Sequence, residues 1–239
     1  MGFLDTLLGR TKPVRPNLDA LFALPSAAVT LQTSAGLVLS GRAGVCWMPP
    51  AGQSAADVQR EIAELLEIPD NPTEAGQATA EGPGSEAAGG STAAGGSKAA
   101  GDDVTAAAAP QRVGSGKAGP MTQTQDTYGY RWLLLDDADV EDLVARVHLV
   151  NSTLQDNGWG PQLLCSVFGV VPGSGADVSA RPFYLVYLFK RGTFYPFAPN
   201  GPQHRDNELE LRIRGVLGAD LPVEPDVSRW FPLWDLPVR

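Results

Sequence analysis

Residue types that could support covalent catalysis are scarce in this chain, whose 239 residues include two cysteines and two histidines. Cys165 lies in the apolar run 163–168, where no positively charged neighbour in the sequence would lower the pKa of its thiol. His204 lies in a polar loop, where solvation and helix capping account for it. We therefore keep a Cys165 and His204 dyad only as an enzyme alternative, and we expect Cys46 and Cys165 to be buried thiols.

Metal, cofactor and phosphate sites have no clear signature in the sequence either. The acidic residues between Asp136 and Asp142 lie at the start of an expected helix, where the helix dipole favours negative charge without a bound cation. The stretch 172–176 lacks the Lys-Ser or Lys-Thr that follows a phosphate-binding loop. We predict no catalytic residue, no metal site and no cofactor, and hence a protein that is not an enzyme and has no small-molecule substrate.

The charge of the chain bears on the class of partner. Its formal net charge is −9, and none of its segments is basic, which argues against nucleic acid as a partner. No run approaches the roughly 20 apolar residues of a membrane span, and the first residues lack the pattern of a secretory signal. We expect a cytoplasmic protein.

The C-terminal residues concentrate aromatic side chains in a segment whose prolines forbid a helix. Such a tail packs along its own domain or docks a partner as an extended strip. Trp230, Phe231 and Trp234 are therefore the candidate partner-binding residues.

The first residues form a second candidate surface. Phe3, Leu4, Leu7 and Leu8 would share one face of a short helix, and basic residues follow at Arg10, Lys12 and Arg15. This face could contact a partner, the body of the protein or an anionic membrane surface, which would place the protein peripherally at the inner face of the membrane.

Composition divides the chain into four pieces. Residues 72–127 contain no Phe, Trp, Tyr, Leu, Ile or Cys, so they cannot offset a backbone entropy cost of roughly 1–2 kcal/mol per residue. We predict an N-terminal amphipathic segment at 1–16, a first half at 17–71, a disordered low-complexity linker at 72–127 and a second half at 128–239. Closing even a long loop costs little, so we expect the two halves to form one composite domain.

The apolar patterns predict an α+β fold with antiparallel sheets covered by helices. Before the linker we expect helices at 17–24, ended by Pro25, and at 55–67, with short strands at 28–32, 37–39 and 45–48. After it we expect strands at 128–135 and 163–171, a hairpin of strands 182–190 and 193–197, and helices at 139–157 and 206–217. This order is compatible with two αβββα half-units, an arrangement similar to secretion-chaperone-like folds.

Several motifs of the chain resemble a known family. They are 2–13 (GFLDTLLGRTKP), 17–25 (NLDALFALP), 150–154 (VNSTL), 160–167 (GPQLLCSV), 194–197 (FYPF) and the tail from Trp230 to Trp234. Together they resemble PspAB, the PspA-associated protein of actinobacterial phage-shock loci, over most of the chain outside the linker. The linker itself departs from the family pattern, because its Ala/Gly-rich sequence is longer and poorer in residue types.

The resemblance implies a cytoplasmic accessory protein of an envelope-stress response, with no catalytic residues to assign. The partner it implies is PspA or another phage-shock component. Our first hypothesis is therefore a non-enzymatic adaptor that acts by protein–protein binding. A chaperone-like module that binds unrelated peptides is the alternative, followed by the Cys165 and His204 enzyme.

Overall fold

The computed structural model describes residues 16–50, 52, 54–66, 121–176 and 180–238. In this part of the chain four α-helices accompany one six-stranded antiparallel sheet, which confirms the α+β prediction. The helices are α2 (Leu24–Ala35), α3 (Ala55–Leu65), α4 (Val140–Leu154) and α5 (Asn207–Leu217). The strands are β1 (Leu37–Trp47), β2 (Met121–Gln125), β3 (Arg131–Asp136), β4 (Leu163–Pro172), β5 (Phe183–Leu188) and β6 (Thr193–Phe197).

The sheet joins segments from both sides of residues 67–120. Its strand order is β2-β3-β1-β4-β5-β6, so β1 lies at its centre, between two strands that follow it by more than eighty residues in the chain. Since a central strand pairs along both edges, residues 37–47 and the chain after 121 fold as one unit. The predicted disorder of 72–127 falls mostly outside the described residues, and its end is ordered, because 121–125 form edge strand β2.

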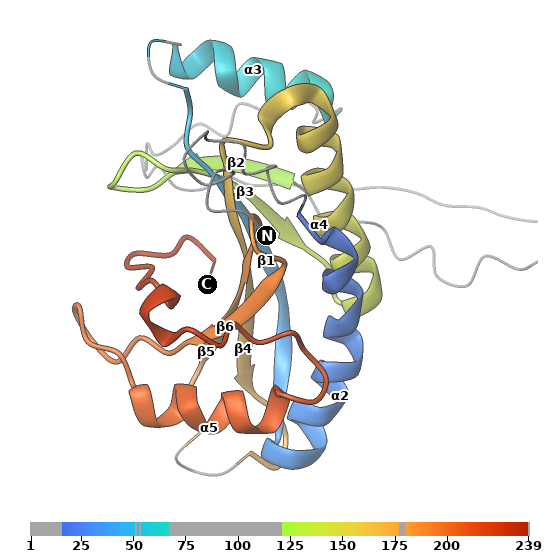
Figure 1. Ribbon diagram of the computed structural model, residues 1–239, viewed down its shortest axis with the longest axis vertical. Helices are drawn as coiled ribbons and strands as arrows, with labels where there is room; N and C mark the ends of the chain where they lie inside the picture. Colours follow the sequence, from blue (N-terminus) through green and yellow to red (C-terminus); the bar gives the residue numbers. More distant parts are fainter. Residues whose placement is uncertain (1–15, 51, 53, 67–120, 177–179, 239) are drawn as a thin grey trace, which may run out of the picture. The chain divides into compact units, whose positions relative to one another are not determined.

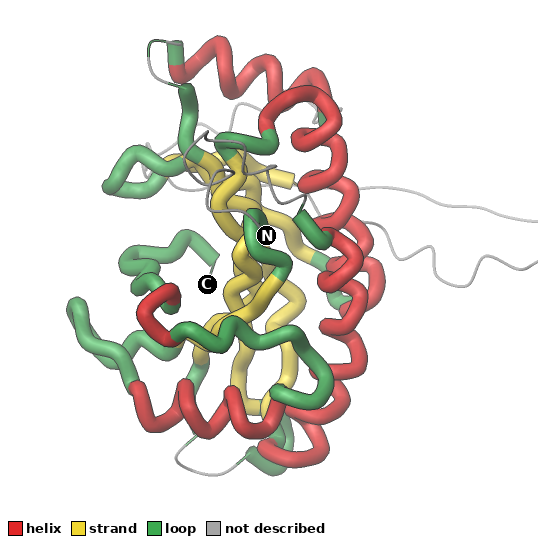
Figure 2. Tube along the Cα trace, viewed as in Figure 1, coloured by secondary structure: helices red, strands yellow, loops and turns green. Residues whose placement is uncertain are grey.

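Two hydrophobic clusters lie on opposite faces of the sheet. In Figure 1, α2 and α4 lie to the right of the strands, and the C-terminal segment, drawn in red, lies to their left. The larger cluster lies on the helix side of the sheet and includes Val45, Leu133 and Phe168 from the strands and Val147 from α4. The other cluster combines alternate strand residues with residues of the C-terminal segment. The α-helices therefore cover one face only, and the other is covered by the C-terminal segment, which is loop apart from one short 3₁₀ turn at Val227–Arg229 (Figure 2).

The predicted strand at 28–32 is wrong, because these residues belong to α2. Leu24, Ala27 and Leu31 are its buried residues, and their spacing is that of one helix face. Pro25 lies in the first turn of α2, where proline's missing N–H costs no helical hydrogen bond, so it helps to start this helix. The preceding residues 18–23 form a 3₁₀ turn, η1, in place of the predicted helix ending at Leu24.

The predicted strands at 37–39 and 45–48 are a single strand, β1, with an irregularity between them. Leu39 lies opposite Val170 and Ala43 opposite Phe168, so β1 holds two extra residues there. Gly41 occupies this bulge with φ +76°, a conformation that glycine adopts without steric cost. The described residues of 17–71 thus hold one strand, which removes the predicted αβββα half-unit from this part of the chain.

Replacing Gly41 by alanine should lower the free energy of unfolding by about 1–3 kcal/mol, because a side chain is strained at this φ. In addition, the new Cβ would lie 2.7 Å from the backbone oxygen of Asp137, whose N–H donates to the Gly41 oxygen. Gly201→Ala is the matched control, since Gly201 also has a positive φ but no atom near the new Cβ. If urea unfolding showed equal losses of unfolding free energy for both variants, the contact with Asp137 would not contribute to stability.

The elements after residue 128 agree closely with the predictions. Helices α4 and α5, strand β4 and the β5–β6 hairpin lie where the patterns place them, and α3 confirms the helix expected from Ala55. The strand expected at 128–135 begins later, at Arg131, because residues 126–130 form a turn.

Candidate functional site

The C-terminal segment Leu221–Val238 crosses the face of the sheet that no α-helix covers, and we call it the tail. It first runs beside edge strand β6, where the Phe194 N–H donates to the Pro222 oxygen and the Glu224 N–H to the Phe194 oxygen. Trp230, Leu236 and Val238 then pack on the sheet and are buried. The tail is thus part of the fold along most of its length.

Three hydrogen bonds, one within the tail and two from the rest of the fold, fix the tail at residues 230 and 231. The Trp230 indole N–H donates to the backbone oxygen of Glu224 at 3.0 Å, and Arg205 Nη1 donates to the Trp230 oxygen at 2.6 Å. The Tyr195 hydroxyl donates to the Phe231 oxygen at 2.8 Å. The Trp230 ring also stacks on Tyr195, with centroids 6.1 Å apart. These contacts fix the path by which the tail leaves β6.

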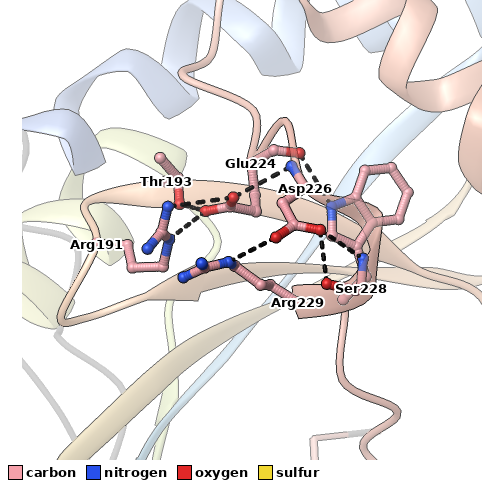
Figure 3. A network of polar contacts seen from close by, with 7 residues as sticks. Arg191, Thr193, Glu224, Asp226, Ser228 and Arg229 are labelled. Atoms are coloured by element: carbon pink, nitrogen blue, oxygen red, sulfur yellow. Dashed lines mark hydrogen bonds and ion pairs between the residues drawn. The ribbon is translucent and has the colours of Figure 1, made fainter.

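A buried carboxylate secures the same turn of the tail. Figure 3 shows the Glu224 side chain facing those of Arg191 and Thr193 from the β5–β6 hairpin. Glu224 is fully buried. Its carboxylate accepts hydrogen bonds from Arg191 Nε and Nη2 and, at 2.8 Å, from Thr193 Oγ1. The backbone N–H of Asp226 donates to it as well. Four donors therefore compensate the loss of water around this charge.

Two acids of this turn have lowered pKa values. Burial opposes ionisation of Glu224, but its hydrogen bonds from Arg191, Thr193 and the Asp226 N–H outweigh burial and hold its pKa below the ordinary value. Hydrogen bonds from the Ser228 hydroxyl, Arg229 and the Ser228 N–H lower the pKa of Asp226 to about 2. Both carboxylates are therefore charged at neutral pH.

Beyond Phe231 the tail borders a cavity of about 490 Å³, which we call the tail groove. Its floor is formed by sheet residues, including Cys46 and Cys165, and the turn at 126–130 and tail residues 231–234 complete the lining. The aromatic lining residues are Tyr128, Tyr130, Trp132, Tyr195, Phe231 and Trp234, and the others are Asp126, Leu164, Leu188, Pro232 and Leu233. A second cavity of about 460 Å³ adjoins it along Tyr128, Leu233 and Trp234.

The only acidic side chain in the lining of the tail groove accepts hydrogen bonds on both of its oxygens. Asp126 Oδ1 accepts from the backbone N–H groups of Tyr128 and Tyr130 at 2.9 and 3.0 Å, and Oδ2 accepts from the Trp132 indole at 2.9 Å. Asp126 therefore shapes the 126–130 wall, and the groove offers mainly apolar and aromatic surface. Such a surface binds apolar side chains rather than charged metabolites.

The two cysteines face each other at the bottom of the tail groove. Cys46 of β1 and Cys165 of β4 are direct partners in the antiparallel register, and both are free and buried, as predicted. A hydrogen bond with the Cys165 side chain and burial raise the pKa of the Cys46 thiol, and the nearby charge of Asp126 acts in the same direction.

The candidate partner residues of the tail differ in exposure. Trp230 is only 3 % exposed, so it holds the tail on the sheet and presents little surface. Phe231 is 58 % exposed, and Trp234 is half-buried with its ring edge-on to Phe197 at 5.3 Å. Both line the tail groove. Phe3, Leu4, Leu7 and Leu8 lie outside the described residues.

The other candidates for chemistry do not converge. Cys165 lines the tail groove, whereas His204 is exposed and lies in the lining of neither cavity described above. His148 packs against the Phe22 ring. Asp139 caps α4 by accepting from Glu141 N and Asp142 N. Among the described residues no group of three or more His, Cys, Asp or Glu side chains could hold a metal ion.

None of the described helices is long and apolar enough to cross a membrane.

Sequence reasoning missed Glu224, Arg205 and Asp126, which position the tail and the groove wall. Asp126 had one local signal, because an aspartate two residues before a Tyr-Gly turn can accept turn N–H groups. Glu224 had none, since its partners Arg191 and Thr193 are more than thirty residues away.

Comparison with known proteins yields one finding. Residues 1–81 and 98–238 match the model of a family described as PspA associated protein B, or PspAB. Within the predicted linker at 72–127 only residues 82–97 are unmatched, so the match extends further into this segment than the resemblance did. No curated protein and no solved structure matches the chain.

Proposed function

This chain belongs to the PspAB family, and from that premise we propose that it is a non-enzymatic accessory protein of the PspA system that acts by binding a protein partner in its tail groove. The family description supports the accessory role and names PspA, which makes PspA the first partner to test. We further propose that the protein works in the cytoplasm.

The observation that carries the binding proposal is the combination of an exposed aromatic rim with an apolar groove. Phe231 is 58 % exposed beside a cavity of about 490 Å³ whose lining is mostly aromatic and aliphatic. Binding energy at protein interfaces concentrates in aromatic residues at the edge of such pockets. Rigid walls favour binding as well, because the tail and the 126–130 turn are already held by hydrogen bonds and lose little entropy on binding.

The groove also indicates the kind of partner segment that it accepts. Its size suits one or two large apolar side chains, and the oxygens of its one carboxylate, Asp126, already accept hydrogen bonds from the protein, so the remaining lining is mainly apolar. We therefore propose that the partner inserts an apolar or aromatic side chain between Trp234 and the 126–130 turn.

Replacing Phe231 or Trp234 by alanine should raise the dissociation constant of the complex with the partner at least about tenfold. This corresponds to a loss of roughly 1.4 kcal/mol of binding free energy. Isothermal titration of the full chain with PspA purified from the same cells measures this. Phe22→Ala is the matched control, because Phe22 is similarly exposed at 52 % but lies in η1, which packs against α4 on the helix side of the sheet. Its affinity should equal that of the unchanged protein.

Two outcomes would contradict the proposal in different ways. No binding to PspA or any other component of its locus would remove the proposed partner. If Phe22→Ala and Phe231→Ala weakened binding of the partner equally, the tail groove would not be the binding site. A chaperone-like function, which the apolar groove would also suit, would appear as comparable binding of unrelated unfolded polypeptides.

A further inference from the structure

The two thiols at the floor of the tail groove have no part in the proposed binding function, yet their placement is specific. The chain has only two cysteines, and they come from strands separated by more than a hundred residues. The register nevertheless sets Cys46 directly opposite Cys165, and directly opposed residues project to the same face of a sheet. Both line the same cavity and neither is bonded to another group.

Opposed residues of antiparallel strands have the separation that a disulfide requires. Their Cα atoms lie about 4.5 or 5.5 Å apart, depending on the type of pair, and disulfides span Cα distances of about 4.4–6.8 Å. The register of β1 and β4 also shifts immediately after Cys46, between Cys46 and Trp47. Such an irregularity interrupts the ladder, and we expect it to let the strands adjust locally.

Charge decides which product of the thiol pair the groove can hold. A pair of thiols could also bind a soft monovalent metal ion as two thiolates. That complex would carry a net negative charge in an apolar cavity, beside the carboxylate of Asp126. In addition, the described residues place no third ligand of the His, Cys, Asp or Glu type with the pair. A disulfide, in contrast, is neutral and apolar, so it carries no penalty of this kind.

We propose that Cys46 and Cys165 form a thiol modification site, at which a low-molecular-weight disulfide entering the tail groove oxidises the pair to an intramolecular disulfide. In the first step one cysteine sulfur, losing its proton, attacks the small disulfide, which releases one thiol and leaves a mixed disulfide. In the second step the other cysteine attacks the protein sulfur of that bond and releases the second thiol. The two protein thiols are oxidised by two electrons, and the small disulfide is reduced to two thiols.

The cavity supplies space for the first step and proximity for the second. Its volume of about 490 Å³ accommodates the mixed disulfide of a small thiol, so the intermediate can form without unfolding. The second thiol is then already adjacent on the neighbouring strand, and well-placed intramolecular groups react at effective concentrations far above millimolar. The intermediate should therefore close faster than millimolar free thiol can reverse it.

Mass spectrometry of the full chain after incubation with 2-hydroxyethyl disulfide and millimolar 2-mercaptoethanol tests the site. The unchanged protein should become lighter by two hydrogen atoms, remain monomeric and carry no adduct, and dithiothreitol should restore it. Cys46→Ser and Cys165→Ser should carry at most a mixed disulfide. An unreactive native protein, a lasting adduct on the unchanged protein, or a dimer linked between chains would overturn the proposal.

Two further measurements guard against unfolding as the route and against misfolded variants. The oxidation rate should not change with urea concentrations below the unfolding transition, and a rate that follows the unfolding equilibrium would rule out entry through the groove. Phenylarsine oxide, which condenses with two neighbouring thiols and loses water to give a neutral product, should be retained by the unchanged protein. Cys46→Ala and Cys165→Ala should each release it at least about tenfold faster, and equal retention would overturn the pairing. None of these readouts involves PspA, so they fail or succeed independently of the proposed partner.

Discussion

Replacing Trp230 by alanine should lower the free energy of unfolding by about 3–5 kcal/mol, the usual cost of removing a large buried aromatic side chain. The Trp230 ring is 3 % exposed, stacks on Tyr195 and lies under the Arg214 guanidinium at 5.9 Å. Its indole N–H also holds the Glu224 oxygen at 3.0 Å. Loss of the ring therefore removes both its packing on the sheet and the hydrogen bond that fixes the turn of the tail. Urea unfolding followed by far-ultraviolet circular dichroism measures the effect.

Trp234→Ala is the matched control for Trp230, since both tryptophans belong to the tail but Trp234 is only half-buried. Its cost in stability should be less than half as large, whereas its cost in partner binding should be the greater when each is measured on folded protein. Trp230→Phe should keep most of the packing and lose about 1 kcal/mol for the missing hydrogen bond. Equal losses for Trp230→Ala and Trp234→Ala would show that Trp230 does not anchor the tail.

Glu224→Gln should be the second most damaging change, with a loss of about 2–3 kcal/mol. The substitution keeps the volume of the side chain but removes the charge that accepts from Arg191 and Thr193. Because the Arg191 side chain is 40 % exposed, water can partly replace the lost partner, which keeps the cost below that of a fully buried pair. The turn that carries the tail away from β6 should loosen, and affinity for the partner should fall with it.

The same carboxylate predicts how stability depends on pH. The pKa of Glu224 is lower in the folded protein than its ordinary value of 4.5, so folding favours the charged form. Its contribution is complete above pH 4.5 and is lost as pH falls through the lowered pKa. Asp226 acts with the same sign down to its pKa of about 2. Unfolding measured between pH 7 and 2 should therefore show a steeper fall for the unchanged protein than for Glu224→Gln.

Asp226→Asn provides the control within the same turn. Asp226 is a neighbouring acid, but its side chain is 46 % exposed, so water can take over the hydrogen bonds of Ser228 and Arg229. Its effect on stability at pH 7 should be much smaller than that of Glu224→Gln. If the two variants were equally stable, the burial of Glu224 would have no energetic consequence.

The proposed binding site and the thiol site share one cavity, which offers a direct link between them. A disulfide between Cys46 and Cys165 would change the floor of the groove, and a partner side chain above it would exclude small disulfides. The two events should therefore compete, in accord with the reciprocity of coupled binding.

Much of this protein follows from local pattern in the sequence. Apolar residues spaced for a helix or alternating along a strand marked α3, α4, α5, β4 and the β5–β6 hairpin, because periodicity depends only on which side of an element is apolar. The apolar runs around Cys46 and Cys165 likewise marked both thiols as buried. Motifs spread along the chain identified the PspAB family, which the family match confirms.

Local pattern was misleading where a contact distant in the sequence decides the conformation. Residues 28–32 have enough β-branched and apolar character to suggest a strand, but the helical spacing of Leu24, Ala27 and Leu31 places them against the sheet. The break predicted between the strands at 37–39 and 45–48 contains Gly41, whereas pairing with β4 on either side and a hydrogen bond from Asp137 keep this residue within one bulged strand.

The sequence alone thus determined the fold class, the buried thiols, the family and the presence of an aromatic tail. Only the tertiary structure decided that the tail covers the second face of the sheet, that Trp230 is buried while Phe231 is exposed, and that Cys46 opposes Cys165. The physical reason is that periodicity reports how apolar a face is but not what covers it. Register and covering depend on pairing between segments far apart in the chain, such as β1 with β4 and Glu224 with Arg191.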